Sequence, residues 1–107
     1  MTQKDFTIST LFDYYAPLLG ENQKQAIEYY YNDDLSLSEI AELMDMTRQG
    51  ARSLIKNGEE KLLEFEEKLG LSSRFAKIDN ACERLLPYLS DNDGALKIIK
   101  EIQSEIQ

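Results

Sequence analysis

Residues 36–56 read SLSEIAELMDMTRQGARSLIK and have the pattern of two helices joined by a tight turn. Ser36 followed three residues later by Glu39 is a capping box, which satisfies two free backbone N–H groups at a helix start. Ala41 is small, as is required where two helices cross closely. Thr47 is placed to cap the second helix. The stretch therefore predicts a helix-turn-helix.

The same stretch holds a local excess of positive charge in an acidic chain. The 107 residues carry a net charge of −8. Residues 1–45 contribute −7 (2 basic, 9 acidic) and residues 59–107 contribute −4 (7 basic, 11 acidic). Residues 46–58 contribute +3 from three basic side chains and no acid. A protein that coats nucleic acid or a membrane surface is basic overall, so any nucleic-acid contact must be local.

The second helix of the pair has a polar face opposite Ala51 and Ile55. Arginine suits phosphate or guanine, glutamine suits adenine and lysine suits phosphate, and a capped helix N-terminus favours an anion. The face we predict to bind nucleic acid consists of Arg48, Gln49, Arg52, Ser53 and Lys56. Any amphipathic helix also has a solvated polar face, so the charges by themselves leave binding open. Three cations support only weak binding unless a dimer doubles the contacts.

The remainder of the chain predicts an all-α fold. Only 5 Gly and 2 Pro occur, and helix-forming residues dominate. A first helix runs to about Leu18, and a second, burying Ala26, Ile27 and Tyr30, ends at Tyr31. A fourth helix runs without a strong breaker to Gly70. A fifth begins at Ser72 or Ser73, residues 91–94 form a turn, and a sixth helix spans residues 95–106.

Two domains follow from this pattern. Residues 1–70 are predicted to form the helix-turn-helix domain, and residues 71–107 a helical pair that packs on it or forms a dimer contact, giving one compact unit. The stripe Leu62, Phe65 and Leu69 extends the fourth helix beyond what the helix-turn-helix core covers. The last helix has an apolar side made of Ile98, Ile99, Ile102 and Ile106. We expect a homodimer.

Residues 18–62 resemble region 4 of the bacterial sigma-70 factors. That family has a Gln-containing leading helix, a Tyr before the turn, a Ser-x-x-Glu-Ile-Ala helix and a Ser/Thr-Arg-Gln start to its recognition helix. The matching residues here are Gln23, Gln25, Tyr30 or Tyr31, Ser36 or Ser38, Glu39-Ile40-Ala41 and Thr47-Arg48-Gln49. Gly50 stands where sigma-like proteins usually have Ala, and Glu59 and Glu60 stand where they are often basic.

Four segments spread over the chain form a second pattern: LFDYYAPLLGENQ, YYYNDDLSLSEIAE, TRQGAR and LLEFEEKLGL. Through them nearly the whole chain resembles the small bacterial YlxM-type proteins. The resemblance implies a helix-turn-helix fold, a regulatory role and an association with the signal recognition particle pathway. Family members are typically encoded beside the GTPase of that particle.

Chemistry other than binding has little support in the sequence. The chain has no His and a single Cys, Cys82, which groups with Ile78, Leu85 and Leu86 as a buried hydrophobe. Adjacent carboxylates diverge around a helix, and no Gly-rich phosphate loop or metal-ligand spacing occurs. The tyrosines at helical spacing are better interpreted as core residues than as base-stacking platforms. We expect no catalytic residue, no cofactor and no metal.

The N-terminal MTQKDFTIST has no apolar signal region, and no run is long enough to span a bilayer. We therefore expect a cytoplasmic protein without membrane insertion. The predicted function is a non-catalytic regulator that binds DNA or RNA in the signal recognition particle pathway. The alternative is a protein-interaction module whose acidic surface binds the particle's GTPase or its receptor, with the helix-turn-helix as scaffold.

Overall fold

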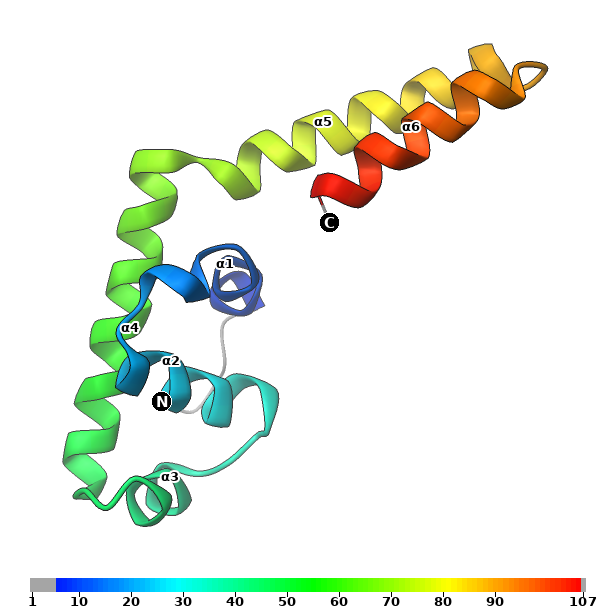
Figure 1. Ribbon diagram of the computed structural model, residues 1–107. Helices are drawn as coiled ribbons and strands as arrows, with labels where there is room; N and C mark the ends of the chain where they lie inside the picture. Colours follow the sequence, from blue (N-terminus) through cyan, green and yellow to red (C-terminus); the bar gives the residue numbers. More distant parts are fainter. Residues whose placement is uncertain (1–5, 107) are drawn as a thin grey trace. The chain divides into compact units, whose positions relative to one another are not determined.

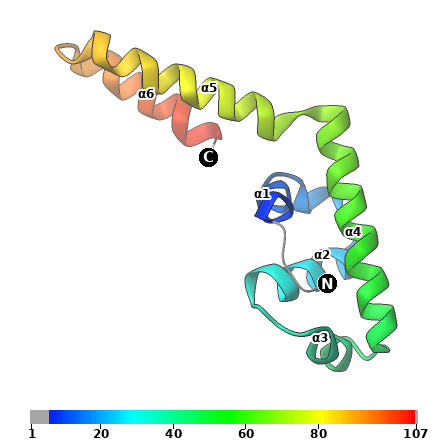
Figure 2. The ribbon, with the colours of Figure 1, turned by 180° about the vertical axis from the view of Figure 1, so that it is seen from behind.

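The computed structural model describes residues 6–106, and every regular element in this range is helical (Figures 1 and 2). The all-α prediction is confirmed. The α-helices are α1 (Phe6–Tyr15), α2 (Glu21–Ile27), α3 (Leu37–Leu43), α4 (Arg48–Leu69), α5 (Leu71–Leu85) and α6 (Asp93–Ile106). Short segments follow three of them: a 3-10 turn η1 (Ala16–Leu18), a π-helical segment η2 (Glu28–Asn32) and a 3-10 turn η3 (Leu86–Leu89).

The contacts divide the chain into two compact units, one ending at Leu69 and one beginning at Gly70. Each unit is described by itself. The predicted packing of the C-terminal helical pair, on the first domain or on a second copy, stays a prediction.

Helix α4 is the element on which the first unit is built. The 22-residue helix has α1, α2 and α3 along one of its sides (Figures 1 and 2). The core around the helix-turn-helix consists of Ala26, Tyr30, Leu37, Ile40, Ala41, Ala51 and Ile55. The predicted burial of Ala26, Ile27 and Tyr30 in the second helix is confirmed. The small residues Ala26, Ala41 and Ala51 in this core let α2 and α3 approach α4 closely.

Helix α2 approaches α4 closely at Gly58, which is buried. A Cβ atom at this position would lie 2.5 Å from Cδ1 and 3.4 Å from Cγ1 of Ile27 in α2. Ile27 is fully buried, so its side chain has little room to move away. Glycine at residue 58 therefore fixes the separation of α2 and α4.

The second half of α4 packs on α1. Leu62 is fully buried. The centroid of the Phe65 ring lies 5.9 Å from the centroid of the ring of the buried Tyr15. The hydroxyl of Tyr15 donates a hydrogen bond of 2.6 Å to the carboxylate of Glu66. The expectation that the Leu62–Leu69 stripe extends beyond the covered part of the helix is wrong for Leu62, because α1 reaches this far along α4. Leu69 is the member that stays exposed, at 46%.

Two helix starts and one helix type differ from the sequence-based expectation. The second helix ends one residue after the predicted Tyr31, but its last part, Glu28–Asn32, is π-helical, which periodicity alone did not indicate. The fifth helix begins at Leu71, since Gly70 has the left-handed φ of 63° that ends α4. The sixth helix begins at Asp93 and not at residue 95, because the Asn92 carboxamide oxygen accepts a hydrogen bond of 3.0 Å from the Ala95 N–H.

The second unit is an antiparallel hairpin of α5 and α6 (Figure 1). Cys82 and Ile99 are buried between the two helices, as predicted for Cys82. The expectation that Ile78 and Leu85 share this burial is wrong, because they are 41% and 46% exposed. Ile98, at 58%, is also exposed, so only part of the predicted apolar side of the last helix is covered. Among residues 6–106, no helix is long and apolar enough to cross a bilayer.

Replacing Gly58 with Ala is expected to lower the free energy of unfolding by about 1 kcal/mol. Overpacking a buried site costs about 1–3 kcal/mol, and Ala regains about 1 kcal/mol over Gly inside a helix. The variant Ile27→Val removes the Cδ1 atom nearest the added Cβ, so Gly58→Ala should cost less in its presence. Urea unfolding of the two single variants and the double variant measures this coupling.

Gly94→Ala is the matched control, since the nearest atom to its Cβ would lie at an ordinary 3.6 Å. This variant should not lose stability. Strictly additive effects of Gly58→Ala and Ile27→Val would show that the two positions do not limit the approach of α2 to α4.

Candidate nucleic-acid interface

Side chains cap the N-termini of both α3 and α4. The Ser36 hydroxyl accepts a hydrogen bond of 3.1 Å from the Glu39 N–H, and the Glu39 carboxylate accepts one of 3.0 Å from the Ser36 N–H. Asp45 turns the chain with a left-handed φ of 53°. The Thr47 hydroxyl then accepts a hydrogen bond of 2.9 Å from the Gly50 N–H. The capping box fixes where α3 begins, and the Thr47 bond fixes where α4 begins and how its first turn is oriented.

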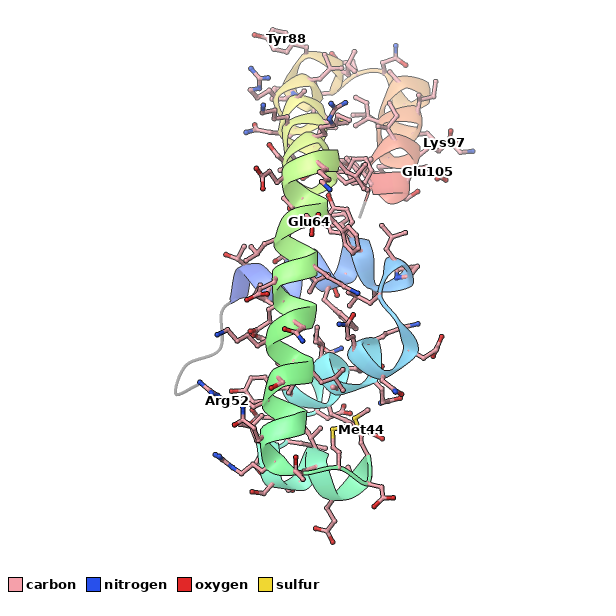
Figure 3. All side chains as sticks on the ribbon, turned by 90° about the vertical axis from the view of Figure 1, so that its left-hand side faces the viewer. Met44, Arg52, Glu64, Tyr88, Lys97 and Glu105 are labelled. Carbon is pink, nitrogen blue, oxygen red and sulfur yellow. The ribbon has the colours of Figure 1, made fainter. Side chains whose placement is uncertain are left out.

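The five residues predicted to bind nucleic acid all lie on exposed positions of α4, while Ala51, Ile55 and Gly58 face the core. Arg52 projects from one side of α4, whereas Met44 lies on the other side near the turn (Figure 3). The side chain of Gln49 donates a hydrogen bond of 3.4 Å to the Ser53 hydroxyl. Within residues 6–106, Arg48, Arg52 and Lys56 form no ion pair. Their charges are available to a ligand.

Arg48 has different surroundings from the other two cations. It lines a shallow hollow of about 350 Å³ between the start of α4 and the segment that leads into α3. The carboxylates of Asp34 and Glu39 line the same hollow and lower its positive potential. Arg52 and Lys56 do not line this hollow and are exposed one and two turns further along the same face. The structure therefore makes Arg52 and Lys56 the stronger cationic part of the face.

The cationic face ends after Lys56. Glu60 is exposed and follows Lys56 by four residues, so it lies one turn further along the same face. Glu59 is partly buried and accepts a hydrogen bond from the Tyr31 hydroxyl. The face therefore extends over Arg48 to Lys56 and is bordered by acid.

The sequence did not indicate two contacts that join the tyrosines to α4. Tyr31 lies in η2 and binds Glu59, and Tyr15 at the end of α1 binds Glu66. The partners are 28 and 51 residues apart, so no local pattern signals them. Tyr15 and Tyr30 are buried, in agreement with their interpretation as core residues. Among the described residues, no group of three or more His, Cys, Asp or Glu could hold a metal ion.

Comparison with known proteins finds one family and many relatives. The profile of a family described as "Putative helix-turn-helix protein, YlxM / p13 like" matches residues 2–103. A UPF0122 protein of Thermoanaerobacter sp. is 40% identical over 110 residues, covering 96% of this chain and 94% of the relative. One from Clostridium perfringens is 41% identical over 100 residues, covering 94% and 89%. One from Bacillus cereus is 36% identical over 107 residues, covering 100% and 97%.

The capping box makes the start of α3 sensitive to pH. The Ser36 N–H, and secondarily its hydroxyl, hydrogen-bond the Glu39 carboxylate and lower its pKa from the ordinary value of 4.5. A lowered pKa in the folded protein means that this stabilisation is present at neutral pH. It is lost as the pH falls below about 4.5 and through the lower, folded-state pKa.

An NMR titration of the Glu39 carboxyl group is expected to give a midpoint below 4.5. In Ser36→Ala the midpoint should move part of the way up, because the hydroxyl is lost and the backbone N–H remains. The same variant should lower the free energy of unfolding at pH 7 by about 1 kcal/mol. An unchanged midpoint in Ser36→Ala would show that the hydroxyl does not stabilise the charged carboxylate.

Proposed function

This chain belongs to the YlxM- and p13-like family of helix-turn-helix proteins, and we propose that it is a non-catalytic regulator that binds nucleic acid. The proposal places the contact on the first turns of α4, through Arg48, Gln49, Arg52, Ser53 and Lys56. It further assigns the protein to the signal recognition particle pathway in the cytoplasm, on the strength of the resemblance to YlxM-type proteins. DNA and the RNA of the particle are the two ligands to be compared.

The observation that carries the proposal is that the cations at the start of α4 are exposed and form no ion pair within the described residues. Arg52 and Lys56 are exposed cations with no ion pair inside the described chain. They lie one turn apart on the helix that a helix-turn-helix places in the major groove, where its N-terminal residues reach base edges. Gln49 lies between the capped helix start and these cations, where a carboxamide can read an adenine edge.

The proposal includes a homodimer, because one copy has few contacts to offer. Each neutralised phosphate contributes about 0.9 to the slope of log affinity against log salt, so three contacts give roughly 2.7. The rest of the chain, with a net charge of −11 outside residues 46–58, opposes approach to a polyanion. Two copies on one nucleic acid double the number of contacts.

Replacing Arg48 and Arg52 together by Ala is expected to weaken binding about tenfold or more and to lower the salt slope by about 1.8. Fluorescence anisotropy with labelled duplex DNA and, in parallel, the particle's RNA measures both quantities between about 50 and 200 mM salt. The control Lys77→Ala/Arg84→Ala removes the same charge from exposed positions of α5. Binding that weakens equally in the control, or not at all in Arg48→Ala/Arg52→Ala, would contradict the assignment of the face.

A second candidate function has a specific observation in its favour. Residues 1–69 carry 7 basic and 14 acidic residues, a net charge of −7. Among the acidic residues, Glu60 and Glu67 are exposed on α4, whereas Glu59 and Glu66 accept hydrogen bonds from tyrosines. In this alternative the acidic surface binds a basic partner, the GTPase of the signal recognition particle or its receptor. The helix-turn-helix then acts as scaffold.

The exposed carboxylates of Glu60 and Glu67 allow a direct test of this alternative. Glu60→Gln/Glu67→Gln removes exposed charge and leaves the tyrosine contacts intact, so it should release a partner held by the acidic surface. Pull-down of the purified GTPase and of its receptor, with quantification of the retained fraction, measures the effect. Full retention by Glu60→Gln/Glu67→Gln would rule out this pair of carboxylates as the binding surface.

A further inference from the structure

The hairpin of α5 and α6 has a very small core of its own. Within residues 70–106, only Cys82 and Ile99 are buried. Units below about 40 residues usually need a disulfide, a metal or a partner subunit to be stable. The chain has a single cysteine, so no internal disulfide can join these helices. The hairpin therefore needs apolar contacts beyond those it makes with itself.

Large apolar side chains remain exposed on both helices of the hairpin. We call these four residues the apolar side: Ile78 (41% exposed), Leu85 (46%), Ile98 (58%) and Ile102 (42%). Two come from α5 and two from α6. A shallow hollow beside Ile98 and Ile102 is lined by Glu101, Ser104 and Glu105.

The four residues lie on the same side of the hairpin. On the other side, Gln103 of α6 donates hydrogen bonds of 3.2 Å to Asp79 and 3.0 Å to Glu83 of α5. Helical geometry places Asp79 and Glu83 on one flank of the buried Cys82, and Ile78 and Leu85 on the opposite flank. On α6 the same geometry separates Gln103 from Ile98 and Ile102. The hairpin therefore has one polar side and one continuous apolar side.

The charge of the unit points to the kind of partner. Residues 70–107 carry 5 basic and 6 acidic residues, a net charge of −1, against −7 for residues 1–69. A nearly neutral surface with both signs of charge gives little attraction to nucleic acid or to a strongly basic protein. In the described part of the first unit the exposed large apolar residues are scattered over η1, α3 and α4 as Leu18, Leu43, Leu63 and Leu69. The surface that matches the apolar side is the same apolar side on the hairpin of a second copy.

We propose that the apolar sides of two copies pack together, so that two hairpins form a four-helix bundle with α6 antiparallel to the α6 of the partner. Lys97 and Glu105 project from the same side of α6 (Figure 3). An antiparallel two-fold arrangement brings Ile98 opposite the partner's Ile102 and Lys97 opposite the partner's Glu105. Both pairs occur twice, because a two-fold interface is self-complementary. Glu101, near the axis, meets its own copy and opposes the pairing.

This inference deepens the homodimer of the proposed function by assigning its surface and geometry. It does not require that the protein bind nucleic acid. Helices of 15 and 14 residues are about 21 Å long, and two of them side by side cover a footprint of roughly 400 Å². Standard interfaces bury about 800 Å² per partner, so the dimer should be weak and concentration-dependent.

Sedimentation equilibrium of the full chain, from about 1 to 100 µM, is expected to show a shift from the 12.3 kDa monomer to twice that mass. Ile98→Gln/Ile102→Gln should raise the dissociation constant at least tenfold. Leu63→Gln, which removes a side chain 50% exposed in α4, is the matched control and should leave dimerisation unchanged. Circular dichroism of each variant checks that its helix content is retained.

A charge exchange tests the orientation and does not remove apolar packing. Lys97→Glu should weaken the dimer several-fold, and adding Glu105→Lys should restore it, since the exchanged pairs are again of opposite sign. Glu101→Gln should strengthen it. A chain that stays monomeric at 100 µM, or a dimer weakened by Leu63→Gln and not by Ile98→Gln/Ile102→Gln, would overturn the proposal. Failure of the charge exchange to restore the dimer would overturn the antiparallel α6 contact.

The same variants separate this inference from the proposed function. Anisotropy with nucleic acid is measured on the unmodified chain and on Ile98→Gln/Ile102→Gln. Nucleic-acid binding by a strictly monomeric chain would overturn the dimer and leave the assignment of the α4 face intact. Dimerisation through the hairpin without nucleic-acid binding would support the dimer and overturn the assignment of the α4 face.

Discussion

The close approach of α2 to α4 at Gly58 is the contact on which the first unit depends. Ile27 occupies the volume that any larger residue at position 58 would need. With this separation fixed, Tyr31 in the segment after α2 reaches the carboxylate of Glu59. Helix α3 then packs on α4 at the short interhelical distance that the small side chains of Ala41 and Ala51 permit. A wider crossing would loosen the small-residue core that carries the helix-turn-helix.

The same crossing divides α4 into parts with different surroundings. From Arg48 to Lys56 only one side of the helix is packed, and its cations have no internal ion pair within the described residues. From Glu59 onward, carboxylates on α4 accept hydrogen bonds from tyrosines of the leading helices. The acids in this part are therefore of two kinds, those held by tyrosine hydroxyls and those facing solvent. The local positive potential depends on keeping the acids out of the first turns.

Local chemistry made the helix-turn-helix predictable from sequence. Ser36 and Glu39 are three residues apart, and Thr47 caps a helix whose N–H donor is also three residues away, so these patterns need no tertiary information. The π-helical segment and the Tyr31–Glu59 bond could not be predicted, because they depend on where α2 meets α4. The exposure of Ile78 and Leu85 was also missed. Periodicity shows that a helix has an apolar side, but only the packing of α5 against α6 decides which part of that side remains uncovered.

The two proposed binding surfaces share a physical limit, which is that each is small. The cationic face has three charges in an acidic chain, and the apolar side has four partly exposed residues on a nearly neutral unit. A polyanion that binds two copies at once adds the phosphate contacts of both, and it also raises the local concentration of the hairpins. The proposed hairpin pairing in turn gives each dimer two cationic faces. Each weak interaction is therefore expected to strengthen the other by the same factor, because thermodynamic linkage is reciprocal.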